Sequence, residues 1–319
     1  MKTLVYGGAG YVGTAVVAEL LREGHEVTVF DAMNFGAESL LGHLHNPKFR
    51  LVKGDVRDAA AVGAALAGHD AAVLLAAIVG EPACNRDPKL AEATNLQGAQ
   101  HVLDAAKKHK VARLVFASTC SNYGVADTST PIDEAGTLNP ISVYSETKVE
   151  AERRLLAAKD EVCTTVLRLS TAFGVSGRMR FDLMVSDFTL SAVRDHKVVI
   201  YGQQFWRPFV HINDIATAIR LVLHAPEDKV RGEVFNVGGD SNNITKLDLG
   251  NMIVEEVAGS NVEFVEQNKD PRSSRVSFAK VKRVLGFEPA WSLRDGVREV
   301  RDALLAGVWK DPIDGRYRN

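Results

Sequence analysis

The sequence has few cysteines and no long apolar run. Its three cysteines, at positions 84, 120 and 163, form no CxxC pair and are too few for a disulfide framework, so a reducing compartment is expected. No apolar stretch reaches the roughly 20 residues that a membrane-spanning helix needs. The first apolar run, Leu4–Tyr6, has neither a basic flank nor a cleavage site. We therefore expect a cytoplasmic protein that does not bind membranes.

Neither sign of charge dominates the chain. Its 38 Lys and Arg residues face 40 Asp and Glu residues, so the net charge is −2 and no strong field favours nucleic acid. The nine histidines show no metal-ligand spacing, so no metal site is expected. The 319 residues, 46% of them hydrophobic, suffice for a large core and two domains. An anionic ligand would have to be held by locally placed arginines and backbone amides.

Short apolar runs alternate with longer amphipathic runs over the first half of the chain. The short runs are continuously apolar, which is typical of strands covered on both faces, and their alternation with helices predicts a parallel sheet. The expected strands are Thr3–Tyr6, Val27–Phe30, Arg50–Val52, Ala71–Ala76, Leu114–Ser118 and Thr164–Leu169. The expected helices are Val12–Glu23, Ala59–Ala67, Pro88–Lys108 and Val143–Lys159. The fold class is therefore α/β, with a doubly wound parallel sheet.

The pattern becomes mixed after about residue 175. We expect a domain over 1–175 and a smaller mixed α/β lobe over 176–319, partly interleaved with the sheet. The expected helices there are Leu183–Arg194, Ile212–His224, Leu247–Ala258, Ala279–Leu285 and Leu293–Ala306, and the expected strands are Val198–Tyr201, Phe209–His211 and Glu233–Val237. The polar stretch Lys310–Asn319 is expected to be an extended tail.

A glycine-rich loop follows the first expected strand, in the sequence TLVYGGAGYVG over residues 3–13. A strand, a turn with this glycine spacing and a helix bring backbone N–H groups to a pyrophosphate, so the loop is a candidate Rossmann dinucleotide site. Its candidate cofactor contacts are Gly7, Gly10, Tyr11, Val12 and Gly13. The alternative is a glycine-rich turn that binds no ligand.

Asp31 closes the second strand, 18 residues after Gly13. A carboxylate there can accept hydrogen bonds from the adenosine ribose, and no arginine follows it to bind a 2′-phosphate, so NAD is favoured over NADP. Asp55, after the third strand, could accept a hydrogen bond from the adenine amino group, or it could cap the helix that follows. Asn95 could brace neighbouring strand ends or be an ordinary polar helix residue.

Tyr144 and Lys148 are four residues apart on an expected helix, so both side chains lie on one face. A nearby ammonium and an oxidised nicotinamide would favour the phenolate, which could then take a proton from a substrate hydroxyl while hydride leaves the carbon. Thr119 follows the fifth strand, 25 residues before Tyr144, and its hydroxyl could bond the same substrate oxygen. A Ser/Thr cluster after a strand could also be an ordinary turn.

Taken together, these residues resemble the extended short-chain dehydrogenase/reductase superfamily, and more closely its nucleotide-sugar epimerase/dehydratase branch of UDP-glucose 4-epimerase-like proteins. The resemblance covers nearly the whole chain. It rests on GGAGYVG (7–13), Asp31, GDV (54–56), LLAA (74–77), STCSNYG (118–124), YSETK (144–148), RLSTAFG (168–174) and RPFVHINDIA (207–216). It implies that Thr119, Tyr144 and Lys148 are catalytic, and that Val56, Ala76 and Ala77 also contact NAD.

The resemblance also implies that the later lobe binds a nucleotide-diphosphate sugar. Arg207 occupies the family's diphosphate-binding position, although it could instead be a surface arginine that ends a strand. Arg180 lies where sugar and nucleotide should meet. Arg275, or alternatively Arg272, would be a second anion contact in the sequence DPRSSR, which could also be a solvated loop.

Three candidate substrate residues depart from the family pattern. Sugar 4,6-dehydratases carry an Asp-Glu pair where this chain has Cys120 and Ser121, so elimination of water lacks its acid and base. Thr171 stands where the family often has a diphosphate-binding Asn. The insert Gly80–Cys84 should shape the sugar pocket. Cys84 and Cys120 are expected to be small pocket-lining residues, and a redox pair is the alternative.

These residues predict an NAD-dependent enzyme that oxidises C4 of a nucleotide-activated sugar, with a 4-epimerase ranked first. A 4-dehydrogenase or 4-ketoreductase that releases its product is the next alternative, followed by a ketoreductase of a non-sugar substrate and then a non-catalytic dinucleotide-binding subunit. The resemblance also implies a homodimer through the helices at Pro88–Lys108 and Val143–Lys159.

Overall fold

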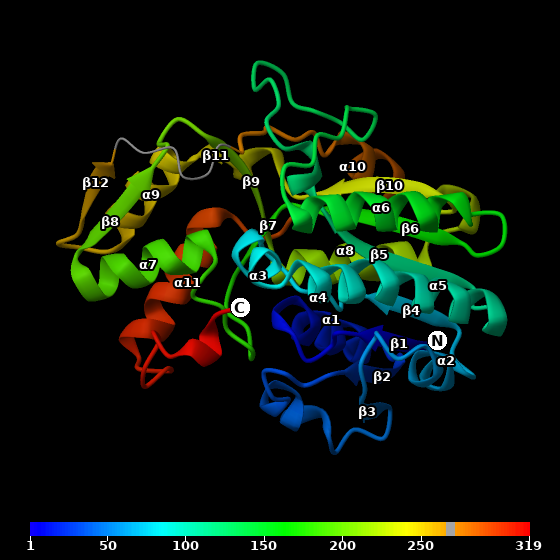
Figure 1. Ribbon diagram of the computed structural model, residues 1–319. Coiled ribbons are helices and arrows are strands. Elements are labelled where there is room, and N and C mark those ends of the chain that lie inside the picture. Colours follow the sequence, from blue (N-terminus) through cyan, green and yellow to red (C-terminus); the bar gives the residue numbers. More distant parts are fainter. Residues whose placement is uncertain (266–271) are drawn as a thin grey trace.

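The computed structural model describes residues 1–265 and 272–319. Its centre is a seven-stranded sheet in the order β10-β6-β5-β4-β1-β2-β3, in which every neighbouring pair runs parallel (Figure 1). The strands are β1 (Lys2–Tyr6), β2 (Glu26–Asp31), β3 (Phe49–Lys53), β4 (Ala71–Leu74), β5 (Arg113–Thr119), β6 (Thr164–Leu169) and β10 (Glu233–Val237). The predicted doubly wound parallel sheet is confirmed.

Helices cover both faces of this sheet. The apolar sides of α1 (Tyr11–Arg22) and α8 (Ile212–His224) form one core with it. Those of α2 (Ala59–Leu66), α5 (Gly98–His109) and α6 (Val143–Ala157) form the other. Because both faces are covered, β1 and β6 are buried along almost their whole length. Within the described residues, no helix is both long and apolar enough to cross a membrane.

The smaller lobe contains two short sheets and a core of its own. One sheet has the order β11-β9-β7 and the other pairs β8 with β12. The strands are β7 (Thr171–Phe173), β8 (Lys197–Tyr201), β9 (Trp206–His211), β11 (Asn243–Thr245) and β12 (Asn261–Val265). The helices α7 (Met184–Asp195), α9 (Lys246–Glu256) and α11 (Leu293–Leu305) pack on them, while α10 (Ala279–Leu285) lies against β10.

The helix expected over Pro88–Lys108 is interrupted. It comprises α4 (Pro88–Glu92), a π-helical turn η2 (Ala93–Gln97) and α5. Asn95 lies in the π-turn, where its amide accepts a hydrogen bond from Ile78 N at 2.8 Å and donates one to Ile78 O at 3.0 Å. The bracing role expected for Asn95 is therefore confirmed, and the wider turn places its side chain against the chain after β4.

The insert after β4 and the polar C-terminal stretch are both more ordered than the sequence analysis predicted. The insert forms a short helix, α3 (Glu81–Arg86). The expectation of an extended tail was wrong, because Trp309 and Tyr317 pack edge-on against Phe181, at 5.0 and 5.9 Å between ring centroids. Asn319 lies beside α3, where its carbonyl accepts a hydrogen bond from Arg86 (Figure 1).

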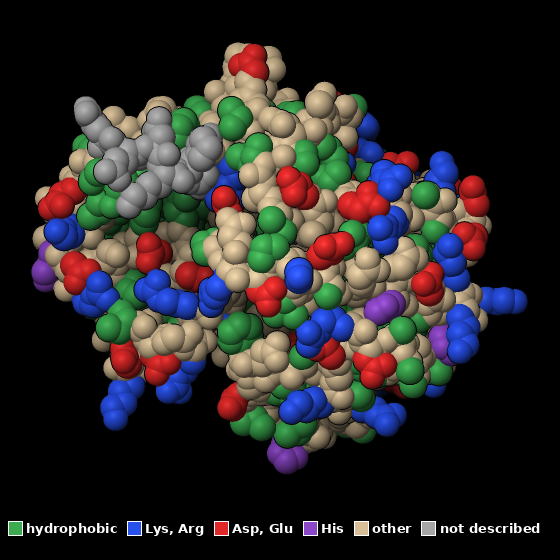
Figure 2. All heavy atoms as spheres, viewed as in Figure 1, with side chains coloured by type: hydrophobic (Ala, Val, Ile, Leu, Met, Phe, Trp, Pro, Cys, Tyr) green, Lys and Arg blue, Asp and Glu red, His purple; other side chains and the backbone are tan. Residues whose placement is uncertain are grey.

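Charged side chains of both signs are interspersed over the face seen in Figure 2. This distribution agrees with the net charge of −2.

Candidate active site

The candidate residues gather at one edge of the large sheet. The glycine loop follows β1, Asp31 ends β2, Ala76 and Ala77 follow β4, and Thr119 ends β5. Parallel strands present their carboxyl ends at the same edge, which is where ligands bind in open α/β sheets. The topology alone therefore brings these segments together.

The glycine loop is packed too closely to hold side chains. Gly7 has φ +85°, and a Cβ there would lie 2.6 Å from Ala76 N. A Cβ on Gly13 would collide with the carbonyl oxygen of Gly7. Helix α1 begins directly after Gly10, which offers no side-chain cap to the first N–H groups. The loop and the helix end thus form a cradle of backbone donors that fits the diphosphate of a dinucleotide.

The carboxylate of Asp31 joins this cradle to the end of β2. Its Oδ2 accepts a hydrogen bond from Ala9 N at 3.0 Å and its Oδ1 accepts one from Met33 N at 2.8 Å. Burial raises the pKa of Asp31. Each oxygen keeps a lone pair for a ribose hydroxyl, so the acceptor that NAD requires is in place.

Asp55 and Val56 lie at the adjacent end of β3. Asp55 accepts hydrogen bonds from the guanidinium of Arg57, which lowers the pKa of the carboxyl. The capping alternative for Asp55 is wrong, because Asp58 caps α2 by accepting from Ala60 N and Ala61 N. Val56 is buried in the core, and its carbonyl oxygen is hydrogen-bonded to the ring of His101. Contact with adenine remains a prediction for Asp55.

Helix α6 carries the candidate catalytic pair. Ser142 and Ser145 cap it reciprocally, which fixes the turn that holds Tyr144. Tyr144 lies close to the Thr119 hydroxyl, and burial raises its pKa to about 12, against the opposing effects of Arg180, Thr119 and Arg272. Without further positive charge, this phenol stays protonated at neutral pH.

Lys148 lies one turn further along α6 and is buried. Its ammonium donates a hydrogen bond to Ala117 O at 2.8 Å and lies 4.6 Å from the centroid of the Phe116 ring. Burial lowers its pKa to about 8, although Glu152 partly opposes this effect. Across the described chain, no carboxylate lies within ion-pair distance of Lys148, so its charge is available to a ligand.

Two of the four candidate arginines lie close enough to affect Tyr144. Arg180 and Arg272 both lower the pKa of the phenol. Arg180 is buried and bonds both oxygens of Asp182, at 3.0 and 2.7 Å. Arg272 lies 4.0 Å from the carboxylate of Glu81 on α3.

Arg207 and Arg275 differ in what they contact. Arg207 is buried in β9 and donates to the carbonyls of Trp206 and Arg272, so the alternative of a surface arginine is wrong. Arg275 donates to Thr128 O at 3.2 Å and lies over the Trp206 ring at 4.7 Å. The structure thus brings Arg272, and not Arg275, to the phenol of Tyr144.

Cys120, Ser121 and Thr171 are placed differently from one another. The thiol of Cys120 is buried, donates to Arg168 O at 3.2 Å, and has its pKa raised to about 12 by burial. Its hydrogen-bond contacts are with Arg168 and Ser170, and not with Tyr144. Ser121 N donates to the Thr119 hydroxyl, and Thr171 begins β7, paired with β9 two residues beyond Arg207.

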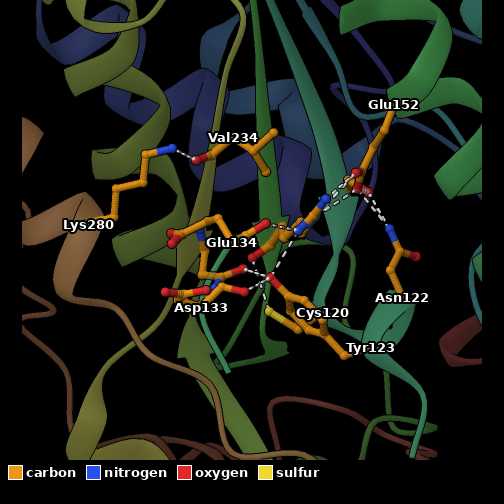
Figure 3. Close-up of polar contacts among 11 residues, drawn as sticks. Cys120, Asn122, Tyr123, Asp133, Glu134, Glu152, Val234 and Lys280 are labelled. Carbon is orange, nitrogen blue, oxygen red and sulfur yellow. Dashed lines mark hydrogen bonds and ion pairs between the residues drawn. The ribbon is translucent and has the colours of Figure 1, made fainter. Parts of the chain in front are cut away.

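A buried polar network that was not anticipated begins one helical turn beyond Lys148 on α6 (Figure 3). Glu152, one turn after Lys148 on α6, forms an ion pair with Arg168 at 2.8 Å. The same carboxylate accepts hydrogen bonds from Ser118 and Asn122, and Arg168 also donates to the hydroxyl of Tyr123. The i, i+4, i+8 spacing of Tyr144, Lys148 and Glu152 was the available signal, because it puts all three on one helix face.

Comparison with known proteins gives one family. The family described as "NAD dependent epimerase/dehydratase family" matches residues 3–238. A dTDP-glucose 4,6-dehydratase of Streptomyces griseus is 31% identical, covering 92% of this chain and 91% of its own length. A UDP-glucose 4-epimerase of Lactobacillus helveticus is 29% identical, covering 97% of this chain and 96% of its own.

A solved structure repeats the likeness at the level of the fold. The crystal structure of DesIV, a dTDP-glucose 4,6-dehydratase of Streptomyces venezuelae, holds bound NAD and superposes with a TM-score of 0.87. It is 27% identical, over 98% of this chain and all of that one. The two activities named among these relatives share a nucleotide-sugar substrate but differ in the product.

Proposed function

Because the chain belongs to the NAD-dependent epimerase/dehydratase family, we propose that it oxidises C4 of a nucleotide-diphosphate sugar and acts as a nucleotide-sugar 4-epimerase. The proposal is carried by one observation. Tyr144 is buried, lies close to the Thr119 hydroxyl, and is one helical turn from Lys148, whose ammonium has no ion-pair partner among the described residues. The cradle of Gly7 and Gly13 with the carboxylate of Asp31 suits NAD beside this pair.

The chemistry requires a base at the sugar hydroxyl and a hydride acceptor at its carbon. NAD, when bound, supplies the hydride chemistry and the positive charge of its nicotinamide. Tyr144 removes the hydroxyl proton once that charge and Lys148 have lowered its pKa from about 12. Thr119, whose hydroxyl lies close to the phenol, orients the same sugar oxygen. In the reverse step, Tyr144 returns the proton to that oxygen.

The positions after Thr119 favour epimerisation over loss of water. Elimination from the sugar needs an acid and a base in addition to Tyr144. Cys120 and Ser121 supply neither, since the Cys120 thiol has a pKa of about 12 and is bonded to a carbonyl below the site. The ketone formed at C4 is therefore expected to be reduced again in this pocket, on either face of the sugar.

The arginines of the later lobe fit the diphosphate of the sugar nucleotide. Arg180 and Arg272 lie near the phenol, and the buried Arg207 touches the backbone of Arg272. A guanidinium binds phosphate oxygens with two parallel N–H groups, so such a cluster favours a doubly charged substrate over a neutral ketone. Thr171 and Ser121 would contact the sugar, and the role of Arg275 remains a prediction.

The test is a panel of UDP-, dTDP-, GDP- and CDP-hexoses incubated with the purified protein, with chromatography of the products. We expect interconversion of one pair of C4 epimers without accumulation of reduced NAD. Accumulation of a 4-keto sugar with reduced NAD would indicate a dehydrogenase instead. Loss of water from the sugar, measured by mass, would contradict the proposal.

The expected homodimer through α5 and α6 remains a prediction. Sedimentation equilibrium would test it.

A further inference from the structure

Arg178 carries a buried charge at the start of the smaller lobe. The residue is 7% exposed, and its Nε is buried with no hydrogen-bond partner among the described residues. Its Nη2 donates to the neutral oxygens Arg318 O and Asn319 Oδ1, at 3.3 and 2.8 Å. The nearby carboxylate of Asp182 is bonded through both oxygens to Arg180.

Such a charge is unfavourable unless an anion completes the site. Burial lowers the pKa of Arg178 to about 10, and repulsion from Arg180 adds to this effect. No carboxylate in the described ranges forms an ion pair with it. Buried guanidinium groups are ordinarily paired, so an unpaired one with an unsatisfied N–H is expected where an anionic ligand binds.

The backbone that leads to Arg178 is tied to the glycine loop. The hydroxyl of Tyr11 donates to Gly174 O at 2.6 Å, and Ser176 donates to Tyr11 O at 2.8 Å. Ser176 also contacts the hydroxyl of Thr14 at 2.9 Å and accepts from Arg178 N at 3.2 Å. Residues 174–178 therefore cross the first turn of α1, where the N–H cradle lies.

The guanidinium itself points to the adenosine side of that cradle. Its Cζ lies 3.8 Å from the centroid of the Phe35 ring, four residues after Asp31. The neighbouring Gly177 packs closely on Ser39, because a Cβ added at Gly177 would lie only 2.9 Å from the Ser39 Cβ. Arg178 is thus held between the first turn of α1, which binds a dinucleotide diphosphate in this fold, and the segment after β2, which follows the carboxylate for the adenosine ribose.

We propose that Arg178 binds the diphosphate of NAD. Its planar fork would complement phosphate oxygens that the backbone N–H groups of α1 also bind. The carbonyl of Arg318 and the amide of Asn319 orient the fork without neutralising its charge. The tie to Tyr11, Thr14 and Phe35 favours this diphosphate over that of the sugar nucleotide. The inference does not depend on which sugar is turned over.

The experiment measures ligand affinity and ligand-free stability, without turnover. Titration calorimetry with ADP-ribose, adenosine and UDP is run on the protein and on Arg178→Gln, with Arg178→Lys as the conservative variant. Arg316→Gln is the control, because within the described part of the chain that exposed guanidinium pairs only with Asp314 and the Tyr317 ring. Loss of a charge-assisted bond predicts about a tenfold to hundredfold weaker affinity for ADP-ribose in Arg178→Gln. Adenosine and UDP should change less than about twofold.

The melting temperature separates binding from a structural role. Because Arg178 is a buried charge without an ionic partner, the ligand-free Arg178→Gln protein should melt no lower than the parent, while its stabilisation by ADP-ribose should shrink. Unchanged affinity for ADP-ribose would overturn the proposal, as would an equal loss for adenosine. A loss confined to UDP would assign Arg178 to the sugar nucleotide. Failure to find a sugar substrate would leave these outcomes interpretable.

Discussion

Two buried polar regions share helix α6, and they differ in how their charges are balanced. Around Glu152, the carboxylate pairs with Arg168 and accepts from Ser118 and Asn122, and Arg168 also bonds Tyr123. One and two turns earlier, Lys148 donates to a carbonyl and Tyr144 lies close to the Thr119 hydroxyl, and neither has an ion-pair partner among the described residues. In the first region the two charges are paired with each other. The second has charge and protons to offer to a ligand.

This difference distinguishes a region that stabilises the fold, around Glu152, from a region that can act on a ligand, around Tyr144 and Lys148. A buried ion pair with supporting hydrogen bonds fixes side chains in place, and removing one of its partners is costly. Shifted pKa values without compensating partners are characteristic of functional sites. The Glu152 network therefore holds α6 and β5 in register, so that Tyr144 and Thr119, one on each element, stay close together.

The largest expected effect comes from removing the two phenol hydroxyls separately. Tyr144→Phe should lower turnover about a thousandfold with the fold intact, because it removes the base. Tyr123→Phe is the matched change in the Glu152 network, where the Tyr123 hydroxyl bonds Asn236 at 2.7 Å. It should cost about 1 kcal/mol of stability and little turnover. Equal turnover in both variants, measured with the substrate found in the panel, would break the distinction.

The next effect is on stability. Glu152→Leu leaves Arg168 buried and unpaired and should cost about 3–5 kcal/mol in urea unfolding. Glu150→Leu is the control on the same helix, since Glu150 pairs with Arg153 and Arg154 at the surface, and it should cost less than about 1 kcal/mol. The double variant Glu152→Leu, Arg168→Met should regain much of the loss. A small effect of Glu152→Leu would show that the network is not the support described.

Lys148→Met tests the region that is not balanced. The folded pKa of Lys148, about 8, lies below the ordinary value of 10.5, so the unfolded chain holds the proton more tightly. The protonated lysine therefore destabilises the fold fully below pH 8, and this cost fades as pH rises towards 10.5. Lys148→Met should lose activity and yet melt at or above the parent at neutral pH. Thermal melts of both proteins should converge as the pH rises through that range, and parallel curves would contradict the reasoning.

The smallest effect lies outside both regions. Asp58 caps α2 through Ala60 N and Ala61 N. Asp58→Ala should cost about 1 kcal/mol in thermal unfolding, Asp58→Asn should cost less because asparagine also caps, and neither should alter turnover. A change in turnover would mean that this edge of the sheet is coupled to the site.

The sequence predicted the elements whose signals are local. Continuous apolar runs located the strands, and the spacing of Gly7, Gly10 and Gly13 located the cofactor cradle. The spacing of Tyr144 and Lys148 similarly placed them together. These signals succeed because strand burial, tight turns and helix faces each depend on a few neighbouring residues.

The features that were missed depend on contacts between distant segments. Cys120 was expected in the pocket, but its thiol turns to the carbonyl of Arg168, 48 residues away. The C-terminal stretch was expected to be an extended tail because most of its residues are polar. Its Tyr317, together with Trp309 just before it, nevertheless packs on Phe181. The environment of Arg178 likewise depends on Tyr11, Phe35 and Asn319. No local pattern encodes such meetings.

The central claim is that hydride passes between C4 of a nucleotide sugar and NAD with Tyr144 as the base. Its most direct test is one turnover with the substrate deuterated at C4, followed by mass spectrometry of the cofactor released on denaturation. The account predicts deuterium in the reduced cofactor when the reaction is stopped early, and none with Tyr144→Phe. Conversion of the sugar while the cofactor stays free of deuterium would contradict it.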